Sequence, residues 1–277
     1  MKEYEQSIID HYGQKDLDTH ILEACERAGR RITLHGDTAS FDEFHIRGRD
    51  ATRELARLAN LREGMKVLDL GCGVGGPART LAAEFGCRVW GVDLVEEYCR
   101  CAAMLTERVG LGEVVTFRQG DMTDLPFEDQ DFDAAWTEHT IMNIEDKGKL
   151  FAEIRRVLRP EGIFALYEIC SGSASPPHFP LPWASDQSIS FLTGQDALGG
   201  MLREAGFEEI LWRDVTEASL EWFRGVVAGI KPRTDNVPRL GLNLLMGTTA
   251  ADKSKNIVRN LKEDRIRVVQ GVFRRTE

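Results

Sequence analysis

The sequence predicts an α/β fold in which a mostly parallel sheet carries helices on both faces. Strand-like apolar runs alternate with helical patterns from residue 66 onward, which is typical of repeated βαβ units. A glycine-rich turn follows the first of these runs, and acidic residues stand where three of the runs end. The predicted strands cover residues 66–70, 87–92, 114–118, 132–137, 162–169, 207–214 and 266–273. The predicted helices between them cover residues 76–85, 95–109, 146–158 and 195–205.

A helical segment is predicted before this alternating pattern. Residues 1–60 read as helices, and we expect them to form a cap on the core. The apolar side chains of Ala51, Leu55, Leu58 and Ala59 recur at helical spacing, which predicts an amphipathic helix just before the first strand.

A tight glycine turn links the first strand to the first helix of the core. The apolar run 66–70 ends at Gly71, and a helical pattern begins a few residues later. Such a turn lets a nucleoside ligand rest on bare backbone. The spacing Gly71-x-Gly73-x-x-Gly76 also matches the dinucleotide-binding fingerprint, so an NAD-dependent oxidoreductase is an alternative at this point.

Asp69 is an acid inside the otherwise apolar end of the first strand. A buried carboxylate is costly unless it is paired. An ammonium or sulfonium group of a ligand would satisfy it, whereas a pyrophosphate would be repelled. Asp69 therefore argues against a dinucleotide. The alternative, in which Asp69 only caps the backbone of the glycine turn, stays open.

Two more acids close the next two strands. Asp93 stands at the tip of the second strand, where a carboxylate is placed to accept hydrogen bonds from both ribose hydroxyls. Asp121 follows the third strand beside Met122, so the carboxylate is placed to accept from an adenine amine while the thioether packs on the ring. With Asp69, these acids form one rim at the edge where open α/β sheets bind ligands.

The second half of the chain adds two segments outside the alternating pattern. Residues 171–194 are a Ser-, Gly- and Pro-rich connector, and a connector of this length is more often functional than neutral. Residues 216–262 form a mostly helical excursion between the last two strands, which we expect to be a lid. The expected organisation is a cap (1–60), a core (61–215), the lid (216–262) and a final core strand (263–277).

At this point the chain resembles the class I S-adenosylmethionine-dependent methyltransferases, of the small-molecule subgroup related to the quinone- and sterol-methyltransferases (methyltransferase type 11). The resemblance covers about residues 50–170, and more loosely 195–215. It implies a Rossmann-like three-layer sandwich whose seven-stranded, mostly parallel sheet has an antiparallel last strand. The matching residues are Val67 to Gly73 with Gly75, Asp93, Asp121-Met122, Leu125-Pro126-Phe127 and Leu158 to Gly162.

The resemblance also implies S-adenosylmethionine as the cofactor and assigns residues to each part of it. The implied cofactor-binding residues are Asp69, Gly71, Cys72, Gly73 and Gly75 for the methionine end, Asp93 and Leu94 for the ribose and adenine, Gly120, Asp121 and Met122 for the adenine, and Thr137 and Glu138 beside the sulfonium.

Three residues are candidates for the chemistry. Methyl transfer depends mostly on positioning, and a base is needed only if the nucleophile still carries a proton. His139 is the predicted base because imidazole titrates near neutrality, the alternative being an ordinary loop residue. Glu138 is the neighbouring acid. Tyr12 is predicted to contact a sulfonium or a cationic substrate through its ring face, and simple helix packing is the alternative.

Composition argues against several classes of protein. The 277 residues carry a net charge of −10, so we expect no binding of nucleic acid or anionic lipid. The N-terminus lacks a secretory pattern and no apolar run is long enough to span a bilayer, which predicts a cytoplasmic protein away from membranes. The six cysteines form no Cys-x-x-Cys pair, so reduced thiols and no metal site are expected.

The predicted function is therefore S-adenosylmethionine-dependent methyl transfer to a nitrogen, oxygen or carbon atom of a small molecule. The acceptor is expected to be apolar or cationic, because the aromatic stretch 179–184 follows the fifth strand. The alternatives are an NAD-dependent oxidoreductase and a cofactor-binding scaffold without catalysis. A homodimer, the acceptor and the need for a base are left open.

Overall fold

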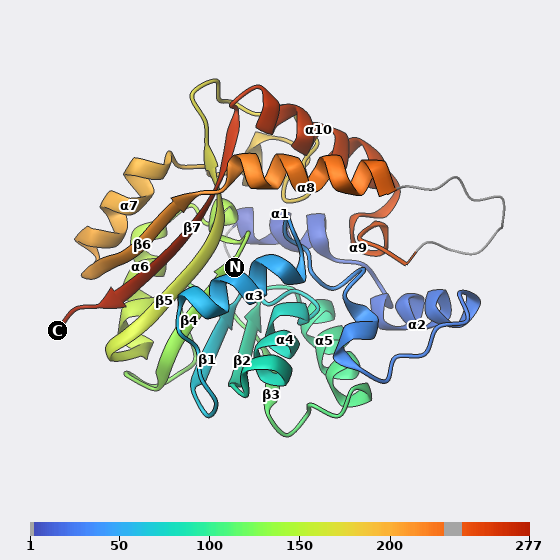
Figure 1. Ribbon diagram of the computed structural model, residues 1–277, viewed down its shortest axis with the longest axis horizontal. Helices are drawn as coiled ribbons and strands as arrows, with labels where there is room; N and C mark the ends of the chain where they lie inside the picture. Colours follow the sequence, from blue (N-terminus) through green and yellow to red (C-terminus); the bar gives the residue numbers. More distant parts are fainter. Residues whose placement is uncertain (1–2, 230–239) are drawn as a thin grey trace.

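The computed structural model describes residues 3–229 and 240–277, and its centre is a seven-stranded sheet (Figure 1). The strands lie in the order β3-β2-β1-β4-β5-β7-β6. Neighbouring strands are parallel except where they pair with β7, which runs antiparallel to both β5 and β6. The predicted sheet with an antiparallel last strand is therefore confirmed. The strands are β1 (Lys66–Leu70), β2 (Arg88–Asp93), β3 (Val115–Gln119), β4 (Phe132–Glu138), β5 (Leu158–Ser171), β6 (Phe207–Asp214) and β7 (Ile266–Arg275).

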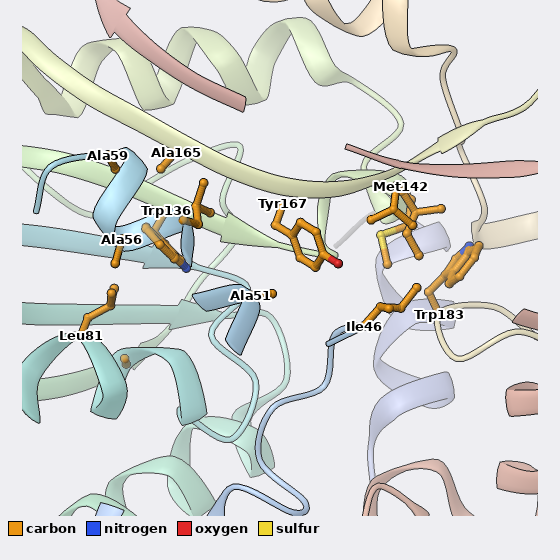
Figure 2. Packing of buried hydrophobic residues seen from close by; sticks show 14 of the residues in the cluster. Ile46, Ala51, Ala56, Ala59, Leu81, Trp136, Met142, Ala165, Tyr167 and Trp183 are labelled. Atoms are coloured by element: carbon orange, nitrogen blue, oxygen red, sulfur yellow. The ribbon is translucent and has the colours of Figure 1, made fainter. Parts of the chain in front are cut away.

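Helices cover both faces of this sheet. On one face, buried side chains of α3, α4, α8 and α10 join a cluster around Trp136 and Tyr167 (Figure 2). On the other face, α6 and α7 pack against the sheet through a second cluster. A third cluster joins α5 to α2. The helices are α1 (Glu3–Tyr12), α2 (Leu17–Arg27), α3 (Arg49–Leu58), α4 (Gly76–Phe85), α5 (Glu96–Arg108), α6 (Lys147–Val157), α7 (Gln195–Glu204), α8 (Thr216–Gly229), α9 (Asn243–Met246) and α10 (Ala250–Lys262).

The central strands are apolar on both faces, as expected of parallel strands covered by helices. In β1, Val67 points into the first cluster while Leu68 and Leu70 belong to the second. All three side chains are fully buried. Asp69 interrupts this run near the carboxyl end of β1, where the register places it beside Gly91 of β2.

The segment before β1 is helical only in part, which corrects the expectation of helices throughout residues 1–60. Gly29, just after α2, has a φ of +63°, a conformation that commonly ends a helix. Between α2 and α3 the chain makes one short 3-10 turn, His35–Thr38 (η1). Residues 39–48, which we call the anchor segment, then reach α3 without forming a helix.

Strand β5 also begins earlier than predicted. Helix α6 ends at Val157, and Leu158 already pairs with Phe132 in β4. The next pair joins Ala134 to Ile163, so the residues between them form an irregularity in the ladder. Pro160 lies in this stretch, and a proline offers no N–H to a ladder, which is why it stands at such an interruption.

The segment between β6 and β7 is helical where it is described. Helices α8 and α10 lie side by side over the first apolar cluster, and the short α9 stands near α1 and α2 (Figure 1). Residues 230–239 of the expected lid lie outside the described residues. Within the described part of the chain, no helix has the length and apolar character needed to cross a membrane.

A buried ion pair holds the anchor segment against α4. The Arg79 guanidinium lies 2.8 Å from the Asp42 carboxylate, and neither side chain is exposed to solvent. Arg79 also donates to the backbone oxygen of Val74 (2.8 Å) and to the hydroxyl of Thr106 (3.1 Å). These bonds compensate the desolvation of the guanidinium and bring three separate elements together.

We expect Asp42→Asn to lower the free energy of unfolding in urea by about 3–5 kcal/mol, because it leaves the Arg79 charge buried without its counter-ion. The control is Asp129→Asn, which breaks an exposed ion pair with Arg156 and is expected to cost about 0–1 kcal/mol. The double variant Asp42→Asn/Arg79→Met is expected to recover much of the loss. Equal costs for the two single variants would contradict the role of this pair.

Candidate functional site

The carboxyl ends of the central strands border a cavity, at the edge where open α/β sheets bind ligands. It lies at the edge of the sheet where the sequence places its three acids, and α1 and the anchor segment contribute to its wall. The lining residues are Tyr4, Glu5, Ile8, Tyr12, Asp42, Phe44, His45, Gly71, Cys72, Gly73, Val74, Pro77, Asp93, Leu94, Val95, Tyr98, Gly120, Asp121, Met122, Glu138, His139, Thr140, Asn143, Ile144 and Leu245.

Asp93 has a carboxylate that is oriented by the backbone. Its Oδ2 accepts a hydrogen bond from the N–H of Gly73 (2.9 Å), and its Oδ1 accepts from the N–H of Val95 (2.9 Å). Burial raises the pKa of Asp93, and these N–H groups act against that shift. Each oxygen keeps a further lone pair. The carboxylate is therefore preorganised to accept from a pair of hydroxyl groups.

Gly71 and Gly73 shape the turn that meets this carboxylate. Both residues have positive φ, +71° and +52°. The N–H of Gly71 donates to the oxygen of Val92 (2.7 Å), and a Cβ added to Gly71 would stand 2.3 Å from Cγ2 of Thr140. A larger residue at Gly71 would displace the loop after β4, so the turn and that loop are fitted to each other.

Asp69 lies beside this turn with one oxygen unpartnered. Its Oδ2 is buried and has no hydrogen bond within the part of the chain that the structure describes. Burial, together with the nearby carboxylates of Asp93 and Glu43, raises the pKa of Asp69 to about 8. An orphaned carboxyl of this kind fits a ligand with an ammonium group and disfavours a pyrophosphate. It therefore fits the methionine end of S-adenosylmethionine.

Asp121 and Met122 follow β3 in the same cavity wall. The backbone N–H and the hydroxyl of Thr123 donate to the two carboxylate oxygens of Asp121, each at 2.8 Å. This local turn orients the carboxylate and leaves it able to accept further hydrogen bonds. Met122 is buried in the apolar cluster of this face, and Leu94 and Gly120 also line the cavity. The combination suits a flat base that carries an exocyclic amine.

Glu138 ends β4 as a buried carboxyl next to Glu43. The hydroxyl of Thr52 donates to Glu138 Oε2 (2.9 Å), as does Trp136 Nε1 (3.1 Å), while Arg49 binds Glu43 (3.0 Å). Burial raises the pKa of Glu138, with Glu43 adding to the shift, and burial next to Asp42 raises that of Glu43 to about 7. The pair therefore carries less than its full negative charge at neutral pH.

His139 has both of its ring nitrogens engaged. Nδ1 lies 3.0 Å from the oxygen of Tyr167, which can only accept, so Nδ1 carries the proton. Nε2 then accepts from the N–H of Ile46 (3.3 Å). Burial, with His45 nearby, lowers the pKa of His139 to about 3. A histidine whose lone pair already accepts a hydrogen bond is poorly placed to remove a proton, which argues against the predicted role as the base.

Tyr12, at the end of α1, ties this helix to the connector. Its hydroxyl donates to Asn143 Oδ1 (2.9 Å), and Asn143 Nδ2 donates to the oxygens of Trp183 (3.0 Å) and Ile189 (2.7 Å). Burial raises the pKa of Tyr12, so the phenol stays protonated. Tyr12 is therefore a structural donor that also forms part of the cavity wall.

A second cavity of about 590 Å³ adjoins the first. Tyr12, Phe44, His45 and His139 line both, and we call these four residues the shared wall. The rest of the second cavity is apolar or aromatic apart from one serine, and among the described residues no Asp, Glu, Lys or Arg lines it.

Segments far apart in the sequence build this second cavity. Ile46 of the anchor segment, Met142 of the loop after β4 and Trp183 of the connector gather on one side of Tyr167 (Figure 2). Helices α8 to α10 complete it. Besides the shared wall, the lining residues are Ile46, Met142, Ile169, Pro182, Trp183, Trp222, Phe223, Leu242, Met246, Ser254 and Ile257.

Most of the predicted cofactor-binding residues line the first cavity, and three do not. Asp69 and Thr137 are buried outside its wall, and Gly75 is the N-cap of α4 with a φ of +81°. The predicted set lacks Tyr4 and Ile8 of α1. Their spacing of four with Tyr12 indicates one face of a helix, and this signal could have found them.

The described residues contain no group of three or more His, Cys, Asp and Glu side chains arranged to hold a metal ion. All six cysteines are buried and free.

The sheet order with an antiparallel β7, the glycine turn after β1 and the acids that follow are those of the class I methyltransferase fold. Residues 68–166 match a family model described as a methyltransferase domain. This part of the chain is therefore similar to a methyltransferase domain, and α1 to α3 and α7 to α10 lie outside the matched residues.

Curated relatives are similar over part of this chain, and solved structures share its fold. A sterol 24-C-methyltransferase of Gibberella zeae is 41% identical over 114 residues, which cover 41% of this chain and 30% of that protein. Phosphoethanolamine N-methyltransferase 2 of Haemonchus contortus with S-adenosyl-L-methionine superposes with a TM-score of 0.73 at 20% identity, covering 100% and 61% of the two chains. The [4+2]-cyclase SpnF superposes at 0.68 with 24% identity, covering 98% and 97%. The chain spans about a third of the length of the curated relatives it matches.

The ligand-free protein is expected to lose thermal stability as the pH rises from about 6.5 to 8. Folded Asp69, with a pKa raised to about 8, holds a proton that the unfolded chain has lost by about pH 4. Linkage then lowers the free energy of unfolding through this window. The lowered pKa values of His45 and His139 act in the opposite sense only below about pH 6.5.

Thermal melts of wild type and Asp69→Asn across this pH range test the assignment. The melting temperature of the variant is expected to fall less steeply with pH than that of wild type. The fall that remains comes from the other buried carboxyls. Asp50→Asn, at an exposed position, is the control and is expected to keep the wild-type slope. An unchanged slope in Asp69→Asn would show that this carboxyl is ionised in the folded state.

Proposed function

We propose that this protein is an S-adenosylmethionine-dependent methyltransferase that acts on a small apolar acceptor. The observation that carries the proposal is the pair of cavities joined at the shared wall. One cavity has the glycine turn and acids that suit a nucleoside with a positive charge, and the other is apolar. A methyl group at the shared wall would lie between the two binding spaces.

Three groups of residues in and beside the first cavity would each bind one part of the cofactor. Asp69 and the turn at Gly71 and Gly73 would hold the amino-carboxyl end. Asp93 would accept from the ribose hydroxyls through lone pairs that the backbone leaves free. Asp121 and Met122 would bind the adenine. When bound, S-adenosylmethionine supplies a methyl group on a positively charged sulfur, which a nucleophile displaces in line.

The second cavity supports an apolar acceptor over a cationic one. A cationic acceptor of the size of an amino acid is usually held by a carboxylate, and the described wall offers none. Aromatic and aliphatic side chains gain free energy by removing apolar surface of a ligand from water. The similarity to a sterol 24-C-methyltransferase points in the same direction, because a sterol is an apolar molecule.

We further propose that the cap (1–60) and the lid (216–262) enclose the reaction. Tyr4, Ile8 and Tyr12 of α1 line the first cavity, while Trp222 and Phe223 of α8 line the second. Both elements therefore separate bound ligands from water. Exclusion of water protects an electrophile from hydrolysis and strengthens the electrostatics around it.

Binding of S-adenosylmethionine, measured by isothermal titration calorimetry, tests the cofactor assignment. We expect Asp93→Ala to weaken affinity by about 10- to 100-fold, the range for losing hydrogen bonds to a charged group. Asp124→Ala, an exposed acid just beyond this wall, is the matched control and should bind as wild type does. NADH is expected not to bind. Binding of NADH without S-adenosylmethionine would instead support an oxidoreductase.

A panel of acceptors, with release of S-adenosylhomocysteine as the readout, tests the acceptor class. Uncharged aromatic and isoprenoid compounds are expected to be methylated, and small amino acids and phosphorylated amines are not. Trp222→Ala should lower kcat/KM for the best acceptor about tenfold or more, because it removes buried aromatic contact from the second cavity. The affinity for S-adenosylmethionine should stay as in wild type, since Trp222 does not line the first cavity.

Leu34→Ala is the control for Trp222→Ala. It also shortens a large apolar side chain, but at an exposed position that is far along the chain from the second cavity. Cofactor binding without methyl transfer to any member of the panel would favour a different use of the fold. The structural similarity to a [4+2]-cyclase makes this outcome worth recording as an alternative function.

A further inference from the structure

Two histidines stand in the shared wall, and they differ in whether a ring nitrogen is free. His139 uses both nitrogens, since Nδ1 donates to Tyr167 and Nε2 accepts from Ile46. His45 donates from Nε2 to the oxygen of Gly48 (2.9 Å), and no hydrogen bond to its Nδ1 occurs among the described residues. Because Nε2 carries the proton, Nδ1 of His45 holds an unused lone pair.

A buried carboxyl pair supports the protonated side of His45. Nε2 lies 3.4 Å from Glu138 Oε1 and 3.8 Å from Glu43 Oε2. The hydroxyl of Thr52, 3.2 Å from Nε2, binds Glu138 as well. Acceptor groups beside one imidazole nitrogen hold the proton there, which fixes the ring tautomer and leaves the other nitrogen as the acceptor.

We propose that His45 is the catalytic base of the methyl transfer and that its acceptor is a hydroxyl group on an apolar molecule. This inference rests on the proposed function. The hydroxyl oxygen forms a bond to the methyl carbon as the carbon–sulfur bond breaks, and the electron pair of that bond stays on sulfur. The hydroxyl proton moves to Nδ1 of His45, so charge and atoms balance without another reactant.

The environment of His45 selects this kind of acceptor. Burial lowers the pKa of His45 to about 4, so the ring is neutral and only weakly basic before the reaction. A weak base cannot deprotonate an alkylammonium ion, whose pKa is about 10 by analogy with lysine. The proton of a hydroxyl becomes strongly acidic as its oxygen acquires the methyl group, so a weak base suffices for it.

Nitrogen chemical shifts of the imidazoles test the geometric basis without any acceptor. In the ligand-free protein at pH 7, His45 is expected to show a protonated Nε2 and an unprotonated Nδ1, and His139 the opposite tautomer. His45→Gln and His139→Asn assign the two sets of signals. A protonated Nδ1 on His45 would overturn the proposal, whatever the activity of the enzyme.

Kinetics with the best phenol or enol of the acceptor panel, 2-naphthol being the first probe, test the role itself. His45→Gln keeps a donor at the place of Nε2 and removes the Nδ1 lone pair. We expect kcat to fall about 100-fold or more, the usual contribution of a general base. The dissociation constant for S-adenosylmethionine should change less than threefold, and added imidazole should restore part of the activity of His45→Ala.

His178→Gln, at an ion pair on the surface, is the matched control and should keep wild-type kcat. Wild-type kcat in His45→Gln would exclude His45 as the base. A loss in His45→Gln that imidazole does not rescue in His45→Ala, with weakened cofactor binding, would indicate a structural role only. If wild type methylates only acceptors without a hydroxyl, the acceptor class is wrong while the proposed methyltransferase function stands. If wild type methylates nothing, the proposed function fails, and the tautomer measurement still decides the geometry.

Discussion

The ion pair between Asp42 and Arg79 is the contact on which the arrangement of both cavities depends. The anchor segment forms neither a helix nor a strand, yet it supplies Phe44 and His45 to the shared wall. Its position is therefore set by side chains. Arg79 fixes the segment to α4 through Asp42, and Arg49 binds the next residue of the segment, Glu43.

A second constraint follows from the acids that this arrangement buries. Asp69, Glu43 and Glu138 are all removed from water, and burial raises the pKa of each. Burying these carboxyls lowers the stability of the ligand-free state at neutral pH. Under the proposed function, a ligand with positive charge would offset this cost. The same desolvation thus weakens the empty fold and favours the ligand that fills it.

Much of the core could be predicted from the sequence because local signals agree there. Apolar runs locate β1 and β4. Gly71 stands where the turn has a positive φ, and Asp93 is the last residue of β2. The adjacent cavity could not be predicted in the same way. Trp183 belongs to the stretch 179–184, whose aromatic character the sequence linked to the acceptor, whereas Trp222 reaches the same cavity only through tertiary packing.

The two histidines show the same limit at a single position. Sequence alone favours His139, because imidazole titrates near neutrality and this residue stands in the loop after β4. Whether an imidazole can accept a proton depends on which of its nitrogens already has a partner, and that is a property of the folded chain. Here the backbone N–H of Ile46 occupies Nε2 of His139.

The division of labour between the two cavities explains why one fold can serve different acceptors. The first cavity is built from strand ends and the turns that follow them, so its geometry is tied to the sheet. The second is built from the anchor segment, the connector and α8 to α10, none of which the sheet requires. Under the proposed function, replacing Trp222 or Met246 would reshape the acceptor space and leave Asp93 and the glycine turn in place. Only the shared wall would meet both demands, since Phe44 and His45 would border the acceptor and also close the cofactor cavity. Selection for a new acceptor is therefore free to act on the second cavity, while the shared wall limits which chemistry can follow.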